Sequence, residues 1–196
     1  DMFIETTRRG IEYHYGGDQG VLKKIVDQNG NATTFSYDSS GDKITKVTDA
    51  SGRSLDITYS GDLITKIVDP AGRTFQYEYD GTDRMTKFIH PIGHEITYQW
   101  NSDDRITAIT DPQGTTQYEF DSQGKIHKRI NKAGAAKVIT FSGTKTIVTD
   151  ERGHDWTYYA TQQGVHKKIE SPLGNTVKFR WGGNFNKIAG IDPAGN

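Results

Sequence analysis

Apolar and polar residues alternate along most of this chain, in short blocks that end at polar segments. Residues 74–79, TFQYEY, place an aromatic side chain at every second position, with polar side chains between them. A period of two predicts a half-buried β-strand with one apolar face. A polar segment follows at residues 80–83, and apolar side chains return at Met85 and Phe88. The pattern therefore predicts a strand, a polar tip and a returning strand, which together form a β-hairpin.

The three-residue spacing of Met85 and Phe88 departs from strict alternation. The same spacing recurs at Ile44/Val47, Ile64/Ile67 and Ile106/Ile109. A β-bulge in the returning strand would produce it, and so would burial of that strand on both faces. The sequence leaves both interpretations open.

The hairpin pattern recurs along the whole chain, each time after a glycine. These glycines are 19 to 22 residues apart and stand at positions 10, 30, 52, 72, 93, 114, 134, 153, 174 and 195. A fixed period in this range is the signature of a repeat protein. We therefore predict an all-β fold of tandem antiparallel β-hairpin repeats, about 21 residues each, in a single array over residues 1–196. Residues 2–4 read as a returning strand and Asp192–Gly195 opens a further turn, so we expect about nine hairpins, truncated at both ends.

The turns between hairpins have a consistent chemistry. In Asp69-Pro70-Ala71-Gly72, aspartate opens the turn, proline fixes φ at the second position and glycine closes it, which is typical of a type I turn. All five prolines of the chain occupy that second position, where they do not interrupt a strand ladder. The predicted structural turn residues are Asp27, Gly30, Asp49, Gly52, Asp69, Pro70, Gly72, Asp111, Pro112, Gly114, Asp150, Gly153, Pro172 and Gly174.

Aromatic residues on the leading strands form the predicted core of the repeats. They are Tyr37, Tyr59, Tyr77, Tyr79, Tyr98, Trp100, Phe120, Phe141, Trp156, Tyr158, Phe179 and Trp181. Aliphatic residues such as Leu55, Ile57 and Val177 stand at matching positions, which favours packing over ligand binding. The alternative is an aromatic cage that binds a carbohydrate or choline, as hairpin repeats of cell-envelope adhesion modules do.

Hairpins placed side by side should form one strip. Because strands twist, we expect a twisted strip that curls as a superhelix. A β-propeller with four-stranded blades is the alternative, although nine copies divide badly into such blades. Terminal hairpins of an uncapped array leave strand edges unpaired, so we also predict edge-mediated self-association of the chain.

Composition narrows the range of functions. The net charge of −1 predicts no field that would hold a nucleic acid. The absence of cysteine excludes a disulfide framework and thiolate metal sites. No signal peptide or apolar run long enough to span a membrane is present, so we expect no membrane insertion.

No residue set in the sequence indicates catalysis, and we predict no enzyme activity, no cofactor and no metal site. His90 and His94 flank one turn, but two histidines without a third ligand indicate turn or surface residues. Acidic tips such as Asp80 and Asp83 lack the ligand spacing of a calcium loop. A lysine recurs near the end of the returning strands, at positions 24, 46, 66, 87, 168 and 187. Such a ladder would serve solubility or an anionic partner; interspersed carboxylates favour solubility.

The recurring Tyr-Asp step resembles the YD repeats of the Rhs (rearrangement hotspot) family. Tyr37-Asp38 and Tyr79-Asp80 are each followed by an aliphatic strand and an Asp-x-x-Gly turn, and the resemblance covers essentially the whole chain. It implies a long β-strip that spirals into a hollow shell. Such shells enclose a C-terminal toxin in bacterial polymorphic toxins and in ABC-type insecticidal toxins, and a similar barrel belongs to the teneurins.

The resemblance implies a structural, scaffolding segment in the shell of a larger protein that is secreted or displayed on the cell surface. Its partners would be neighbouring repeats of that protein and an encapsulated toxin domain. Self-cleavage by acidic residues, which the family performs, cannot be assigned to this chain, because each Asp-Pro pair is explained by its turn. A carbohydrate- or cell-envelope-binding adhesion module is the alternative function.

Overall fold

A computed structural model describes residues 3–17, 20–182 and 187–191 of the chain. Every regular element in these residues is a β-strand, and none of them forms a helix that could cross a membrane. Contacts between residues divide the chain into two units, residues 1–97 and residues 98–196. The two units share one architecture, and each is described by itself.

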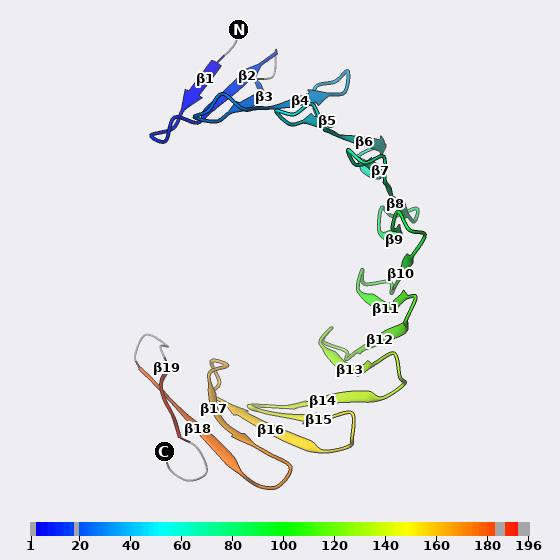
Figure 1. Cartoon of the computed structure of the whole chain (residues 1–196). Coiled ribbons are helices and arrows are strands. Elements are labelled where there is room, and N and C mark those ends of the chain that lie inside the picture. The colour runs from blue at the N-terminus through cyan, green and yellow to red at the C-terminus, as the bar shows by residue number, and fades with distance from the viewer. Residues whose placement is uncertain (1–2, 18–19, 183–186, 192–196) are drawn as a thin grey trace. The chain divides into compact units, whose positions relative to one another are not determined.

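In the first unit, each strand pairs antiparallel with the next one along the chain (Figure 1). The strands are β1 (Phe3–Thr6), β2 (Glu12–Gly16), β3 (Val21–Val26), β4 (Ala32–Tyr37), β5 (Ile44–Thr48), β6 (Ser54–Ser60), β7 (Leu63–Val68), β8 (Thr74–Tyr79), β9 (Met85–Ile89) and β10 (Glu95–Trp100), of which residues 95–97 pair with β9.

The second unit repeats this pattern from β11 to β19. Its strands are β11 (Ile106–Asp111), β12 (Gly114–Phe120), β13 (Ile126–Ile130), β14 (Ala136–Ser142), β15 (Lys145–Thr149), β16 (Asp155–Ala160), β17 (His166–Glu170), β18 (Thr176–Trp181) and β19 (Lys187–Ile191). The predicted all-β fold of tandem antiparallel hairpins is confirmed. Uninterrupted pairing within each unit argues against separate four-stranded propeller blades.

A β-bulge explains the three-residue spacing on the returning strands. In the hairpin of β8 and β9, Glu78 pairs with Lys87 but Tyr79 pairs with Met85, so Thr86 is an extra residue. The bulge places Met85 opposite Tyr79 and Phe88 opposite Tyr77, on one face of the sheet. The same shift follows His14, Ser36, Thr58, Glu119, Tyr159 and Arg180. Of the two interpretations left open by the sequence, the bulge is the one observed.

The sheet in each unit is a single layer with no second layer packed on it. Among the described residues, only Ala108 and Thr116 are buried, at 5% and 9% exposure. Larger apolar side chains are half-buried or exposed, including Leu55, Phe141 and Trp156 at 40%, 42% and 38%. One face of each sheet is therefore apolar, and it is covered only by contacts between neighbouring side chains.

The turn between β11 and β12 is one residue shorter than the regular turn between hairpins, and the strand register compensates for it. Asp111 pairs directly with Gly114, so only two residues connect β11 to β12. In the regular turn, the N–H of Asp69 donates to the carbonyl oxygen of Arg73, which leaves three residues between them. Because the turn lacks one residue, the apolar side chains of β12 keep their register with β11 and stay on the apolar face.

The turn expected at Asp192–Gly195 and the first apolar residue, Met2, lie outside the described residues.

Candidate functional site

The turns between hairpins are closed by an aspartate and a glycine, as Asp69 and Gly72 illustrate. The Gly72 N–H donates to the Asp69 carbonyl oxygen over 2.9 Å, and Gly72 has a φ of +77°. The Asp69 carboxylate accepts hydrogen bonds from the N–H groups of Ala71 and Arg73 at 2.9 and 3.0 Å. A type I turn followed by a left-handed residue is a common hairpin connection, and the carboxylate satisfies N–H groups left free by the turn.

The same backbone bond occurs at four other predicted turns. It joins Gly30 to Asp27, Gly52 to Asp49, Gly153 to Asp150 and Gly174 to Ser171. Pro70, Pro112 and Pro172 occupy the second position of their turns. An arginine four residues after the aspartate lowers the pKa of Asp49 and of Asp69, through ion pairs with Arg53 and Arg73 at 2.6 Å.

The hairpin tips use the same capping chemistry, which the sequence analysis described only as polar. The Asp80 carboxylate accepts from the N–H groups of Thr82 and Arg84 at 2.8 and 3.2 Å. The Thr82 hydroxyl and the Arg84 guanidinium hold the pKa of Asp80 well below its usual range. Asp83 takes the left-handed conformation that glycine takes elsewhere, with a φ of 64°. The carboxylate of Asp80 is thus occupied by its own turn.

The described part of the chain holds no group of three histidine or acidic side chains that could bind a metal ion. The His90 ring packs edge-on against Phe75, with centroids 5.8 Å apart, and His90 also lies edge-on to Phe88. His90 is therefore part of the aromatic packing of the hairpin of β8 and β9.

Each leading strand has three alternating positions on its apolar face, as Phe75, Tyr77 and Tyr79 show on β8. In four hairpins, the aromatic residue at the third of these positions, here called the third aromatic position, ties its hairpin to the preceding one. The hydroxyl of Tyr79 donates to the carbonyl oxygen of Ile64, fifteen residues earlier, over 2.8 Å. Tyr59 donates to Ile44, Tyr37 donates to Leu22, and the Trp181 indole N–H donates to His166, all at the same separation. Each acceptor is the residue at which the register of its own hairpin shifts.

This tie has a physical cause. A bulge disrupts the strand ladder and leaves backbone groups without a ladder partner. The phenol group reaches that point from the next hairpin, and burial raises the pKa of Tyr37 and Tyr79. Sequence reasoning assigned these residues to packing and missed the hydrogen bond. The signal was the third aromatic position, where Ala160 is the exception to the aromatic residues, whereas aliphatic residues occupy the first two positions freely.

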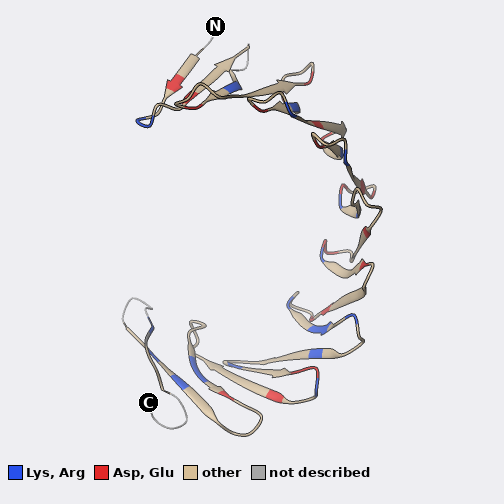
Figure 2. Cartoon of the chain, viewed as in Figure 1, with Lys and Arg blue, Asp and Glu red and all other residues tan. Residues whose placement is uncertain are grey.

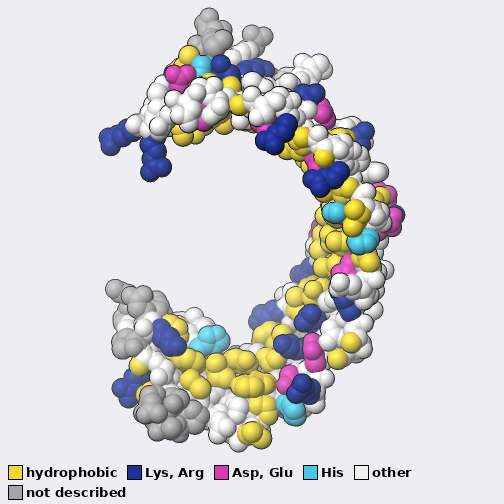
Figure 3. Space-filling view, viewed as in Figure 1, with side chains coloured by type: hydrophobic (Ala, Val, Ile, Leu, Met, Phe, Trp, Pro, Cys, Tyr) yellow, Lys and Arg dark blue, Asp and Glu magenta, His cyan; other side chains and the backbone are white. Residues whose placement is uncertain are grey.

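The other predicted aromatic residues line the apolar face. Tyr77 lies 5.4 Å from Phe88 between ring centroids. A basic side chain lies over several rings at the tip side, as Lys43 does over Tyr59, Arg105 over Phe120 and Lys125 over Phe141. In the second unit, Figure 3 shows hydrophobic side chains gathered over the part that carries β14 to β17 in Figure 1. Trp156 and Tyr158 on β16 belong to this face.

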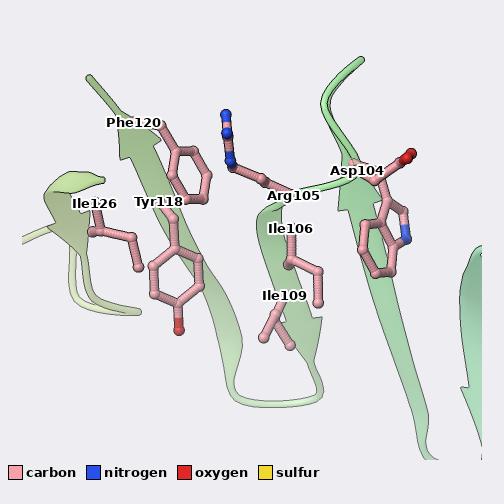
Figure 4. A pocket seen from close by; sticks show the side chains of 8 residues that line it. Asp104, Arg105, Ile106, Ile109, Tyr118, Phe120 and Ile126 are labelled. Carbon is pink, nitrogen blue, oxygen red and sulfur yellow. The ribbon is translucent and has the colours of Figure 1, made fainter. Parts of the chain in front are cut away.

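A groove of about 520 Å³ opens on the apolar face of the second unit. Its lining is Trp100, Asp104, Arg105, Ile106, Ile109, Tyr118, Phe120 and Ile126. Figure 4 shows the isoleucines of β11 beside the aromatic side chains of β12. Arg105 forms an ion pair with Asp103 at 2.7 Å, so the rim is polar while the floor is apolar.

The opposite face carries the lysine ladder with the exception of Lys187, for which the prediction was wrong because the bulge places it opposite Trp181 and over the Phe179 ring on the apolar face. Cross-strand carboxylates pair with several lysines of the ladder. Lys46 pairs with Asp56 at 2.9 Å and Lys128 pairs with Glu119 at 2.8 Å. Lys87 lies between Glu78 and Glu95, at 3.7 and 3.5 Å. This pairing favours the interpretation of the ladder as a solvated face.

A profile of the teneurin YD-shell family matches residues 11–170. The chain belongs to this family. Members of the YD-shell family are structural, so membership supports a structural shell role for this chain as well.

Solved structures show the same fold. The crystal structures of TcdB2-TccC3-TEV and TcdB2-TccC3-Cdc42 superpose on the YD-shell chain with TM-scores of 0.55 and 0.56, each at 12% identity over 95% of this chain. TcdB2-TccC3 without its hypervariable C-terminal region gives 0.54 at 15% identity over 92%. The chain spans only 14%, 14% and 10% of the length of those chains. No curated protein sequence matches it.

Proposed function

We propose that the chain is a segment of the wall of a closed β-shell in a larger protein, and that this shell encapsulates a toxin domain. The parent protein would be secreted or displayed on the cell surface. The observation that carries the proposal is the one-sided sheet of each unit: apolar side chains such as Leu55 in the first unit and Phe141 in the second stay exposed on one face, and no second layer of the described residues covers that face. A soluble protein rarely leaves a continuous apolar face in contact with solvent. Enclosure of that face inside a shell removes it from solvent.

The hydrogen bonds of the third aromatic position support the same role. Tyr37, Tyr59 and Tyr79 donate to the backbone of the preceding hairpin, so their polar groups serve the wall and are not presented to a ligand. This counts against the carbohydrate-cage alternative, which stays a prediction. It supports a wall in which each repeat is fastened to the next.

The test is the accessibility of each face in the parent protein. The chain has no cysteine, so single cysteines report on one position each. Leu55 and Thr58 lie on the same strand, β6, on opposite faces, and both are exposed here. In the parent protein, we expect Thr58→Cys to react with a maleimide carried on a large polymer, while Leu55→Cys reacts only after unfolding. In the 196-residue chain both should react. Equal labelling of the two positions in the folded parent protein would contradict a closed shell.

A further inference from the structure

Two basic residues occupy directly opposed positions on the apolar face of the second unit. In the regular hairpins, the residue that pairs with the second of the three alternating positions on the leading strand is apolar. Phe88 lies opposite Tyr77, and Ile67 lies opposite Ile57. In the hairpin of β12 and β13, Arg129 occupies this position, opposite Tyr118. Lys137 on β14 lies directly opposite Arg129, and Figure 2 shows blue segments on these two neighbouring strands. Like charges directly opposite each other destabilise a sheet, so we expect this pair to lower the stability of the apolar face.

The charges around this pair leave a surplus of positive charge. Arg129 lies 3.8 Å from the carboxylate of Glu151, and both side chains are partly exposed. The Asp150 carboxylate accepts from the N–H groups of Arg152 and His154, at 2.9 and 3.0 Å, and so belongs to its own turn. A hollow of about 260 Å³ is lined by Lys137, Asp150, Glu151, Arg152 and His154. Arg129, Lys137 and Arg152 thus stand against two carboxylates, which leaves one positive charge in excess. Asp150 is engaged by its own turn and Glu151 by Arg129.

The cation pair adjoins the apolar groove described above. Tyr118 and Ile126 line the groove, and Tyr118 lies opposite Arg129 in the register. Ile126 and Phe141 are exposed at 40% and 42%, so apolar surface also flanks the pair. We define the acid-accepting groove as Ile109, Tyr118, Phe120 and Ile126 together with Arg129 and Lys137.

We propose that the acid-accepting groove binds an acidic polypeptide segment, with an apolar side chain in the groove and a carboxylate on Arg129 and Lys137. Neighbouring strands are about 4.8 Å apart, so the two anchor points lie roughly 5–10 Å apart. An extended chain covers that distance in two or three residues. The ligand is thus a segment in which an acidic residue follows an apolar one by two or three positions. The proposal rests on the proposed function, because the segment would come from the contents of the shell.

The test measures the binding of short synthetic peptides to the 196-residue chain by fluorescence anisotropy. The probes carry phenylalanine followed three residues later by glutamate, glutamine or lysine. We expect the glutamate peptide to bind on the order of tenfold more tightly than the lysine peptide, since opposite charges attract at both anchors. An equal affinity for the two peptides would overturn the proposal.

Three double variants test whether Arg129 and Lys137 cause the preference for the glutamate peptide. Arg129→Glu/Lys137→Glu should reverse the preference, so that the lysine peptide binds more tightly. Lys128→Glu/Lys145→Glu changes the charge equally on the opposite face and should keep the preference for glutamate; equal effects of the two double variants would mean that only net charge matters. Arg129→Ile/Lys137→Ile restores the apolar pattern and should abolish the preference. If the glutamate variant fails to fold by circular dichroism, this third variant decides, and a preference retained in it sinks the proposal.

The outcome is separable from that of the proposed function. Loss of peptide selectivity together with protection of Leu55→Cys in the parent protein would leave the shell standing and remove the acid-accepting groove. Selective peptide binding together with full labelling of Leu55→Cys would support the groove and contradict the closed shell.

Discussion

The hairpins of residues 74–89 and 114–130 have equivalent strand pairing but different sequences. In the first, a three-residue connection precedes Phe75 and the aromatic face is complete. In the second, a two-residue connection precedes Thr116, and Arg129 takes the place of Phe88. The strand pairing is nevertheless equivalent in the two hairpins. The turn before β12 is one residue shorter, and the side chains on the apolar face of β12 stand one position closer to the turn glycine, so the two changes cancel. The repeat therefore preserves the face on which a side chain lies, and it tolerates changes in spacing and in residue type.

The strongest test of this difference is the closing glycine of each turn. Gly72 has a φ of +77° with open space where a Cβ would stand, whereas Gly114 has a φ of +130° and a Cβ there would lie 3.3 Å from Lys132. We expect Gly72→Ala to cost roughly 1–2 kcal/mol and Gly114→Ala roughly 3 kcal/mol. Urea denaturation of both variants checks the order. Equal costs would mean that the short turn relaxes to the regular geometry.

The second test concerns the tie between hairpins, which Tyr79 makes and Phe120 at the matching position cannot make through a hydroxyl. Tyr79→Phe removes the donor to the Ile64 carbonyl oxygen and should lower the free energy of unfolding by about 1 kcal/mol. Tyr77→Phe on the same strand and face is the matched control, since its hydroxyl has no hydrogen bond within the described residues; it should cost only a few tenths of a kcal/mol. A similar loss in the free energy of unfolding in both variants would show that this hydrogen bond does not stabilise the fold.

The sequence predicted the hairpin, its period and its turns because these follow from local chemistry. Asp69, Pro70 and Gly72 each restrict the backbone within four residues, and alternation in residues 74–79 reports one buried face. The tie from Tyr79 to Ile64 was missed because its acceptor is a backbone carbonyl exposed by a bulge in another hairpin. The pairing of Arg129 with Lys137 was missed for a similar reason: it depends on the register between strands, which single-strand periodicity does not give.

A third test compares an aspartate tip with an asparagine tip. The pKa of Asp80 is lowered from 3.8 by the Thr82 hydroxyl and by Arg84, whereas Asn101 caps its tip with an amide oxygen that accepts from Asp103 and Arg105. A carboxyl whose pKa is lower in the folded state stabilises the fold above its ordinary pKa. This stabilisation is lost as the pH falls from about 4 through the folded-state pKa.

Asp80→Asn should therefore make the acid decline of the urea midpoint shallower below about pH 4. Asn101→Asp should make it steeper. Measurements from neutral pH down to about pH 2 follow the upper part of this decline. Parallel curves for Asp80→Asn and the unchanged chain would show that the carboxylate of this tip does not contribute to acid sensitivity.

The smallest expected effect is a gain, and it bears on why Arg129 and Lys137 are there at all. Matching positions on the leading strands hold Leu55, Ile96 and Val177, so Lys137→Ile restores the repeat pattern and removes one of two opposed cations. It should raise the free energy of unfolding by roughly 0.2–1 kcal/mol.

Salt separates the two contributions to that gain, because the part that comes from relieved repulsion should shrink at high ionic strength while the part that comes from apolar contact should not. Lys137→Gln removes the charge without adding apolar surface and should show only the salt-sensitive part. A loss of stability in both variants would mean that Glu151 and Asp150 already neutralise the positive charges of Arg129 and Lys137. The two cations would then have a structural role in the sheet. A gain would mean that the sheet is less stable with Lys137 than without it, which is the expected result if the residue serves a ligand.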